Sequence, residues 1–314
     1  MTEAPPVVAL FGATALGKSD VAVELARLLG AEICVADSMQ VYAGLPIVTN
    51  QPDAGQRAAA RHHLVGFVSP QDDFTVAEFA SRAHTVIDGL TGAGRRVVVE
   101  GGSGLYLRAA LGDLEFGAPP DGELRRSLEE RWARDPAALV AELERRAPDV
   151  AARVDTRNAR RVIRALEALS GERPDQCRGA SGDRLWRQAE RYPHRLVALV
   201  PDDDRGALRS RIDARVDEML AAGALEEVAA ARAAGAFSRT AAQAIGVREL
   251  SGVLDGELAL DAAAARMKTR TRALARRQLT WMRKLPAAAA VPAAGRPPAA
   301  VAADVYHLLQ SVSW

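Results

Sequence analysis

The sequence predicts an α/β fold in which a parallel sheet carries helices on both faces and is interrupted by an all-helical insertion. Short apolar runs typical of buried strands alternate with segments of helical periodicity, as expected for parallel strands joined by helical crossovers. Strand-type runs then disappear for about eighty residues between the third and fourth of them. The four predicted strands span residues 7–11, 32–36, 95–100 and 195–200.

Helix signals fill the intervals between these strands. The segment 20–30 has apolar residues at helical spacing and ends at a glycine, and Thr75 and Glu78 form a capping box that opens another helix. Within the insertion, helices are expected to begin at Asp121 and at the pair Asp135-Pro136. Further helices are predicted over residues 158–169, from 204 onward, and over 266–284.

These patterns divide the chain into four segments. Residues 1–114 are the first part of the core and 115–194 the helical insertion, while 195–285 are the second part of the core with a basic C-terminal helix. The Ala/Pro-rich residues 286–314 are predicted to form a flexible tail that can end in a short helix.

The first strand runs into a phosphate-binding loop (P-loop). Residues 12–19, GATALGKS, match the pattern G-x-x-x-x-G-K-[ST], which binds phosphate through backbone N–H groups and the N-terminal end of the following helix. Lys18 is one of three lysines among 41 basic residues, so a chance match is improbable. The loop predicts a polyphosphate or pyrophosphate ligand, with Ser19 as a ligand of Mg²⁺.

Two more polar groups stand at predicted strand ends. Asp37 and Ser38 follow the strand 32–36, and the stretch GGSGLY at 101–106, which contains Ser103, follows the strand 95–100. Ligands of open α/β sheets bind beyond the carboxyl ends of the strands, so these residues are candidates for the site.

Arginine is concentrated in two helices. Arg157, Arg160, Arg161 and Arg164 share one helical face, which is either solvated or in contact with a phosphate backbone, and we favour the second interpretation. The segment 266–284 carries eight basic residues, no acid and Trp281. This combination indicates nucleic-acid binding.

Composition limits the remaining possibilities. The net charge of +1 identifies no partner, whereas 48% hydrophobic residues support a sizeable core. Cys34 and Cys177 form neither a disulfide framework nor a metal-ligand pattern, and the pair His62-His63 is more typical of packing and loop hydrogen bonds than of a metal site. With no secretory or membrane-spanning signal, we expect a cytoplasmic monomer that does not contact membranes.

An ordered set of motifs resembles one family, the tRNA dimethylallyltransferases, also called tRNA isopentenyltransferases. The resemblance extends over nearly the whole chain to residue 284. It rests on GATALGKS at 12–19, DSMQVY at 37–42, GGSGLY at 101–106, RRVIRALE at 160–167, RIDAR at 211–215, AIGVRE at 244–249 and RRQLTW at 276–281.

The resemblance implies transfer of a dimethylallyl group from dimethylallyl diphosphate to the exocyclic amine of the adenine 3′ to a tRNA anticodon. Asp37 would be the general base, and Lys18 and Arg215 would stabilise the departing diphosphate, with Mg²⁺ as cofactor. The implied donor-site residues are Gly12, Ala13, Thr14, Ala15, Leu16, Gly17, Lys18, Ser19 and Ser103. The implied tRNA contacts are Asp37, Ser38, Met39, Gln40, Arg160, Arg161, Arg164, Gly246, Arg248, Arg276, Arg277 and Gln278, with the helical insertion as a tRNA-binding domain.

Three residues depart from the family pattern. Leu16 stands where Ser or Thr is usual, Gln51 where lysine is usual, and Asn158 where Asp is common. These departures bear on affinity and substrate range rather than on the class of reaction.

Other functions stay open at the level of sequence. A P-loop kinase of a small metabolite would use Asp37 to deprotonate a hydroxyl and Arg215 to stabilise the transferred phosphoryl group. A non-catalytic RNA-binding or ATPase module is the second alternative, supported only by Leu16 and Gln51. A transferase acting on free adenine nucleotides is disfavoured by the large insertion.

Overall fold

The computed structural model describes residues 6–114, 122–170, 190–201, 205–285 and 289–311. Contacts divide the chain into two compact units. One unit comprises Met1–Gly112 with Glu190–Trp314, and the other is Asp113–Ala189. Two predicted helix starts, Asp121 and Asp204, lie outside the described residues, as does Cys177.

The first unit is built on a six-stranded sheet in the order β3-β2-β4-β1-β5-β6, and all of its pairings are parallel. Its central strands are buried on both faces, which explains their continuous apolar runs. The strands are β1 (Val7–Gly12), β2 (Ala31–Val35), β3 (His62–His63), β4 (Arg96–Gly101), β5 (His194–Val200) and β6 (Ala289–Pro292).

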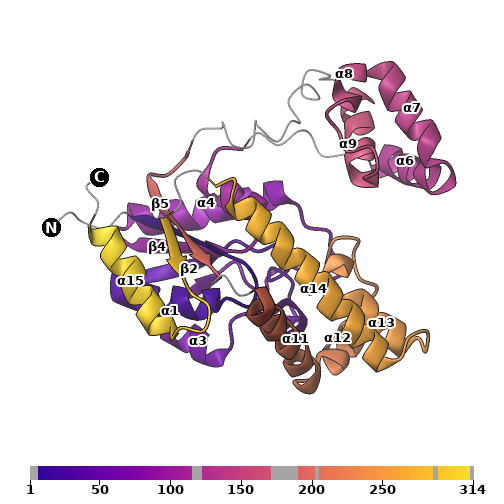
Figure 1. Ribbon diagram of the computed structural model, residues 1–314. Helices are drawn as coiled ribbons and strands as arrows, with labels where there is room; N and C mark the ends of the chain where they lie inside the picture. The colour runs from indigo at the N-terminus through magenta and orange to yellow at the C-terminus, as the bar shows by residue number, and fades with distance from the viewer. Residues whose placement is uncertain (1–5, 115–121, 171–189, 202–204, 286–288, 312–314) are drawn as a thin grey trace. The chain divides into compact units, whose positions relative to one another are not determined.

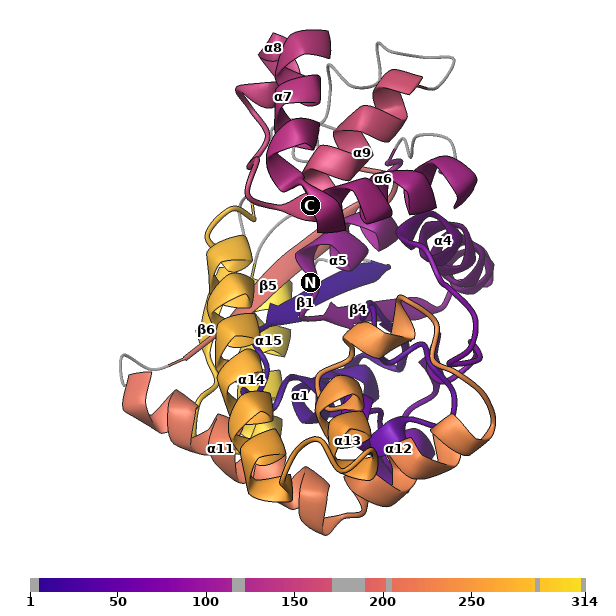
Figure 2. The ribbon, with the colours of Figure 1, turned by 90° about the vertical axis from the view of Figure 1, so that its right-hand side faces the viewer.

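Helices cover both faces of this sheet, as predicted (Figure 2). On one face, α1 (Lys18–Leu29) packs against α15 (Pro298–Gln310), and both contribute to an apolar cluster with the strands. On the other face, α4 (Val76–Gly92) and α5 (Gly104–Leu111) pack on each other and on β4. The predicted capping box of α4 is present, because the Glu78 N–H donates to Thr75 Oγ1 and the Thr75 N–H donates to Glu78 Oε2.

A second group of helices follows β5. The long basic helix α14 packs against α11, α13, α5 and β1, so it links the helical group to the sheet (Figure 1). The elements are α11 (Arg205–Ala221), α12 (Ala224–Ala233), the 3₁₀ turn η2 (Ala241–Gln243), α13 (Val247–Leu254) and α14 (Leu260–Met282).

The prediction of a flexible Ala/Pro-rich tail was wrong for the described residues 289–311. β6 pairs with β5, and α15 buries Val301, Val305 and Leu309 against α1. The alanine-rich composition did not predict this structure. Small apolar residues bury little surface by themselves, so this strand and helix depend on packing against other elements. The partners are β5 for the strand and α1, near the start of the chain, for the helix.

The proline-rich segment 42–73 contains short elements of regular structure. It forms α2 (Pro46–Thr49), α3 (Ala54–Ala59) and the edge strand β3. His62 is hydrogen-bonded through Nδ1 to the Ala60 carbonyl, and His63 contacts Glu32. Both histidines therefore have structural partners.

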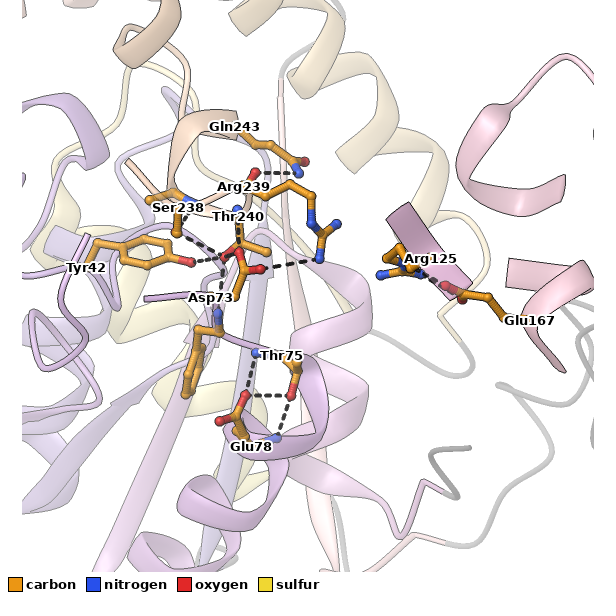
Figure 3. A network of polar contacts seen from close by, with 12 residues as sticks. Tyr42, Asp73, Thr75, Glu78, Arg125, Glu167, Ser238, Arg239, Thr240 and Gln243 are labelled. Atoms are coloured by element: carbon orange, nitrogen blue, oxygen red, sulfur yellow. Dashed lines mark hydrogen bonds and ion pairs between the residues drawn. The ribbon is translucent and has the colours of Figure 1, made fainter. Parts of the chain in front are cut away.

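The second unit is helical throughout its described residues. Its core includes Leu128, Leu139, Leu143, Val162 and Leu166. Arg125 donates to Glu167 through Nε and Nη2 at 2.6 and 2.8 Å, a bidentate pair that ties its first helix to its last (Figure 3). The helices are α6 (Gly122–Arg134), α7 (Pro136–Arg146), α8 (Pro148–Ala151) and α9 (Ala159–Ser170). Across the described parts of both units, every helix is too short or too polar to cross a membrane.

Candidate active site and nucleic-acid interface

The phosphate loop connects the central strand β1 to α1. Gly17 is the N-cap of α1 with a φ of 70°, and Ala15 has a φ of 63°, so two loop residues adopt the left-handed conformation. A Cβ at Gly12 would lie 3.2 Å from Cβ of Leu199 on the adjacent β5. The strand, loop and helix that the motif requires are all present.

Glu100 meets the phosphate loop from the end of β4. It is fully buried, its carboxylate forms an ion pair with Lys18 Nζ, and its Oε1 accepts a hydrogen bond from Ser19 Oγ at 3.4 Å. Because β4 is the parallel neighbour of β1, the acid emerges beside the loop. Glu100 was not among the site residues predicted from the sequence. Its signal was an acid closing an otherwise apolar strand, where a buried carboxylate needs a cation.

Ser19 and Glu100 offer oxygen atoms of the kind that Mg²⁺ prefers. Among the described residues, no cluster of three or more His, Cys, Asp or Glu side chains could hold a metal ion. A hydroxyl and a carboxylate nevertheless suit a cation that takes most of its ligands from water and substrate phosphate. These two residues therefore fit Mg²⁺ bound together with a diphosphate.

Asp37 lies just beyond the end of β2, on the far side of β4 from the phosphate loop. The N–H groups of Met39 and Gln40 donate to its Oδ1 at 2.8 and 3.3 Å, which fixes the carboxylate. Burial raises the pKa of Asp37, the two backbone hydrogen bonds and Lys18 lower it, and Glu100 raises it. The carboxylate is therefore within electrostatic reach of the phosphate loop.

The glycines of GGSG allow neighbouring parts of the chain to pack closely against the backbone at the carboxyl end of β4. A Cβ at Gly101 would lie 2.3 Å from the Ala36 carbonyl oxygen, and a Cβ at Gly104 would lie 2.3 Å from the Trp281 ring. Ser103, between them, is the N-cap residue of α5, and its side chain makes no capping hydrogen bond. Ser103 thus lies just beyond the carboxyl end of β4, where no capping bond occupies its hydroxyl.

Gln278 is buried beside the phosphate loop. Its Oε1 accepts a hydrogen bond from the Thr14 N–H at 2.8 Å, and only 7% of the residue is exposed. A contact of Gln278 with tRNA stays a prediction. Sequence spacing could not reveal the contact with Thr14, because it joins residues 264 positions apart.

Helix α11 brings Arg215 towards the phosphate loop. Leu208 and Ile212 on this helix share an apolar cluster with Leu16 of the loop. Burial lowers the pKa of Arg215, whereas Asp20 in the first turn of α1 is the largest of the effects that raise it. The predicted catalytic cation is therefore within electrostatic reach of the start of α1.

The basic residues of α14 and its C-terminal flank fall into two groups. Lys268, Arg270 and Arg272 form ion pairs with Asp217, Glu249 and Asp213, which anchor α14 to α11 and α13. The others are exposed and have no ion pair within the described chain; they are Arg266, Arg276, Arg277, Arg283 and Lys284. Arg276 and Arg283 are seven residues apart, as are Arg277 and Lys284. This spacing places the four residues on the same side of α14 and its C-terminal flank.

The segment that contains Gly246 and Arg248 is held firmly between its neighbours. Gly246 is buried with a φ of 110°, and a Cβ there would lie 3.1 Å from both Met267 and Val48. Its N–H donates to Glu249, which is paired with Arg270 of α14. Arg248 is exposed.

A hydrogen-bond network ties Thr240, the residue before η2, to the chain that follows Asp37 (Figure 3). Tyr42 Oη donates to Thr240 Oγ1 at 2.6 Å, and the Thr240 N–H and hydroxyl donate to Asp73 Oδ1 at 3.0 and 2.9 Å. The Phe74 N–H donates back to Thr240 Oγ1 at 3.1 Å. Three loops distant in sequence thus form one polar framework.

Comparison with known proteins identifies the family. Residues 40–285 match the family model described as IPP transferase. The chain belongs to the IPP transferase family. The resemblance expected from the motifs is thereby confirmed.

Relatives of this IPP transferase family member match over most of their length. A tRNA dimethylallyltransferase of Anaeromyxobacter dehalogenans is 43% identical over 280 residues, covering 88% of this chain and 92% of the relative. One of Thermomicrobium roseum is 39% identical over 290 residues, covering 91% and 85%. The crystal structure of the tRNA isopentenylpyrophosphate transferase of Bacillus halodurans aligns with a TM-score of 0.70 at 30% identity, covering 97% of this chain and 96% of the other.

The structure explains two departures from the IPP transferase pattern. Leu16 is 3% exposed and packs against Leu208 and Ile212, so its side chain contributes to the core instead of offering a hydroxyl. Gln51 donates to the Tyr42 carbonyl at 2.6 Å, and Arg57 Nη2 donates to Gln51 Oε1 at 3.4 Å. Arg57 thus supplies a positive charge beside the position of the missing lysine. Among the described residues, no side-chain contact explains Asn158.

The arginines predicted on the insertion of this IPP transferase are exposed, Arg157 just before α9 and the others along it. Arg157 contacts Asp155 and Arg164 lies 3.6 Å from Glu167, so these two guanidinium groups have local acidic partners. Arg161 is exposed without an ion pair in the described part of the chain. A contact of this face with tRNA stays a prediction.

Proposed function

We propose that this chain transfers a dimethylallyl group from dimethylallyl diphosphate to the exocyclic amine of the adenine 3′ to the anticodon of tRNA, releasing diphosphate. The observation that carries the proposal is a fixed carboxylate, Asp37, within electrostatic reach of Lys18 in a phosphate loop. The names of the relatives support the same reaction. The metabolite-kinase alternative is not favoured.

Asp37 would act as the general base. The lone pair of an adenine amine is delocalised, so the amine is a weak nucleophile and must lose a proton as its bond to carbon forms. Met39 and Gln40 hold one oxygen of Asp37, leaving the other to accept that proton. The new bond joins the adenine nitrogen to the first carbon of the prenyl group, while the carbon–oxygen bond to diphosphate breaks.

The phosphate loop would stabilise the leaving group. Negative charge develops on the diphosphate oxygens as the carbon–oxygen bond breaks, and preorganised cations lower the energy of that state. Lys18 is held at the loop by Glu100, and Arg215 approaches from α11. Ser19 and Glu100 would hold Mg²⁺, which neutralises diphosphate charge when it is bound.

The exposed arginines would bind tRNA. A stacked adenine cannot reach a recessed loop, so the base must be flipped out of the anticodon arm while the surrounding backbone is held. Arg276 and Arg277 on α14, and Arg160 and Arg161 on α9, are exposed and can contact phosphates. An enzyme acting on tRNA in this way is expected in the cytoplasm.

A labelled-donor assay tests the proposal. The protein is incubated with Mg²⁺, dimethylallyl diphosphate labelled in the prenyl group, and tRNA lacking the modification. We expect label in the RNA, at the adenine 3′ to the anticodon, with release of unlabelled diphosphate. Complete absence of transfer, or ATP-dependent phosphorylation of a small metabolite, would contradict it.

A further inference from the structure

The phosphate loop is joined to α14 by a partly buried hydrogen bond. Gln278 Oε1 accepts the Thr14 N–H at 2.8 Å, and Gln278 is 7% exposed. Thr14 lies within the loop, between the end of β1 and the N-cap Gly17. A loop whose backbone N–H groups must converge on an anion depends on external contacts to hold its shape.

The surroundings hold the Gln278 amide in one position. A Cβ at Gly102 would lie only 2.4 Å from Gln278 Nε2, so the glycine leaves room for the amide. Ala275 and Leu279 of α14 share an apolar cluster with Leu16 and Ala13 of the loop. The helix therefore forms a wall of the loop, and Gln278 provides the polar contact within it.

We propose that Gln278 is a positioning residue that holds the phosphate loop in its anion-binding shape through the Thr14 N–H. The proposal rests on the proposed function for its biological role, but it concerns the anion site alone. Without the acceptor, the partly buried Thr14 N–H loses its partner, and the loop shifts to satisfy it with water. Diphosphate binding must then restore the original loop, which weakens the observed affinity.

Binding of inorganic pyrophosphate with Mg²⁺ tests this role without RNA or catalysis. In Gln278→Met, which keeps side-chain length and removes the acceptor, we expect the pyrophosphate Kd to rise about tenfold. Gln278→Leu is a second variant without an acceptor and should behave alike. Met267→Ala is the matched control, because it removes a buried side chain of α14 that faces Gly246 rather than the loop.

If Gln278 has a purely structural role, the Gln278 variants and Met267→Ala should all have lower melting temperatures than the wild type. Their pyrophosphate Kd values should then stay near that of the wild type. That result overturns the proposal. Steady-state kinetics give a second readout, since KM for the donor should rise while KM for tRNA stays within about twofold. If the wild type binds pyrophosphate but transfers no prenyl group, the proposed function fails and the test of Gln278 still stands.

A separate observation concerns Arg211, one helical turn before Arg215 on α11. Its Nε is buried without a hydrogen-bond partner, and no ion pair to Arg211 occurs among the residues that the structure describes. Residues 208, 211, 212 and 215 lie on one side of a helix, and Leu208 and Ile212 pack against Leu16 of the phosphate loop. An unpaired cation held beside an anion site is suited to bind that anion.

The geometry points to Arg211 as a second α11 cation that contacts the bound diphosphate. We expect Arg211→Gln to raise the pyrophosphate Kd about tenfold. Arg209→Gln is the matched control, since Arg209 is exposed on the same helix and should stay within about twofold of the wild type. Equal Kd values for Arg211→Gln and the wild type would overturn the assignment, and melting curves identify any variant that is unfolded.

Discussion

The ends of β2 and β4 both carry a carboxylate, yet the two groups are held in opposite ways. Asp37, beyond β2, accepts hydrogen bonds from two backbone N–H groups on one oxygen. The charge of Lys18 acts on it electrostatically and lowers its pKa. Glu100 at the end of β4 is fully buried and pairs directly with Lys18 and Ser19. The difference supports our proposal that the first acid accepts the proton and the second organises the phosphate loop.

Replacing Asp37 should produce the largest effect. For Asp37→Ala we expect transfer to fall by about two to four orders of magnitude, because the amine loses its base, while pyrophosphate and tRNA still bind. Single-turnover rates and separate binding measurements check this. Asp72→Ala, an exposed aspartate in the loop before α4, is the control. Unchanged transfer in Asp37→Ala would remove Asp37 from the base role.

Replacing Glu100 should have a smaller effect that depends on the metal. In Glu100→Gln we expect transfer to fall about ten- to a hundredfold and the Mg²⁺ concentration for half-maximal rate to rise, because a carboxylate beside Ser19 is lost. Glu32→Gln is the control, since Glu32 is a buried, ion-paired acid on β2, in the strand rather than beyond its carboxyl end. An unaltered Mg²⁺ dependence in Glu100→Gln would contradict this organising role.

A change outside the two strand ends separates RNA binding from chemistry. The double variant of Arg276→Ala and Arg277→Ala should weaken tRNA binding about tenfold and reduce the salt slope of log Kd by about two, one for each lost phosphate contact. Lys268→Ala, whose lysine is paired with Asp217, should leave that slope unchanged. Equal salt slopes for the wild type, the double variant and Lys268→Ala would show that Arg276 and Arg277 make no phosphate contact.

The smallest expected effect is a shift of the pH profile. Asp37 must be ionised to accept a proton, and burial raises its pKa, so transfer should decline with falling pH above the ordinary aspartate value of about 3.9. Glu100 raises the same pKa, so the decline in Glu100→Gln should move to lower pH. Transfer rates across the acid range, with circular dichroism as a check of folding, measure both. A shift to higher pH would contradict the coupling.

Features that depend on neighbouring residues were predictable. The phosphate loop, the capping box of α4 and the strands that deliver Asp37 and Glu100 follow from motifs, periodicity and composition within short windows. The helical insertion was recognised in the same way, as a long interval without strand patterns. These signals are local because backbone hydrogen bonds and glycine conformations act over a few residues.

The sequence by itself therefore determined the fold class, the phosphate loop, the candidate base and the family. Only the tertiary structure decided which charges of α14 are anchored and which are exposed, that Glu100 holds Lys18, and that Gln278 reaches Thr14. It also showed that the C-terminal residues complete the sheet. Each of these contacts joins residues distant along the chain, and their pairing is set by packing that no local pattern encodes.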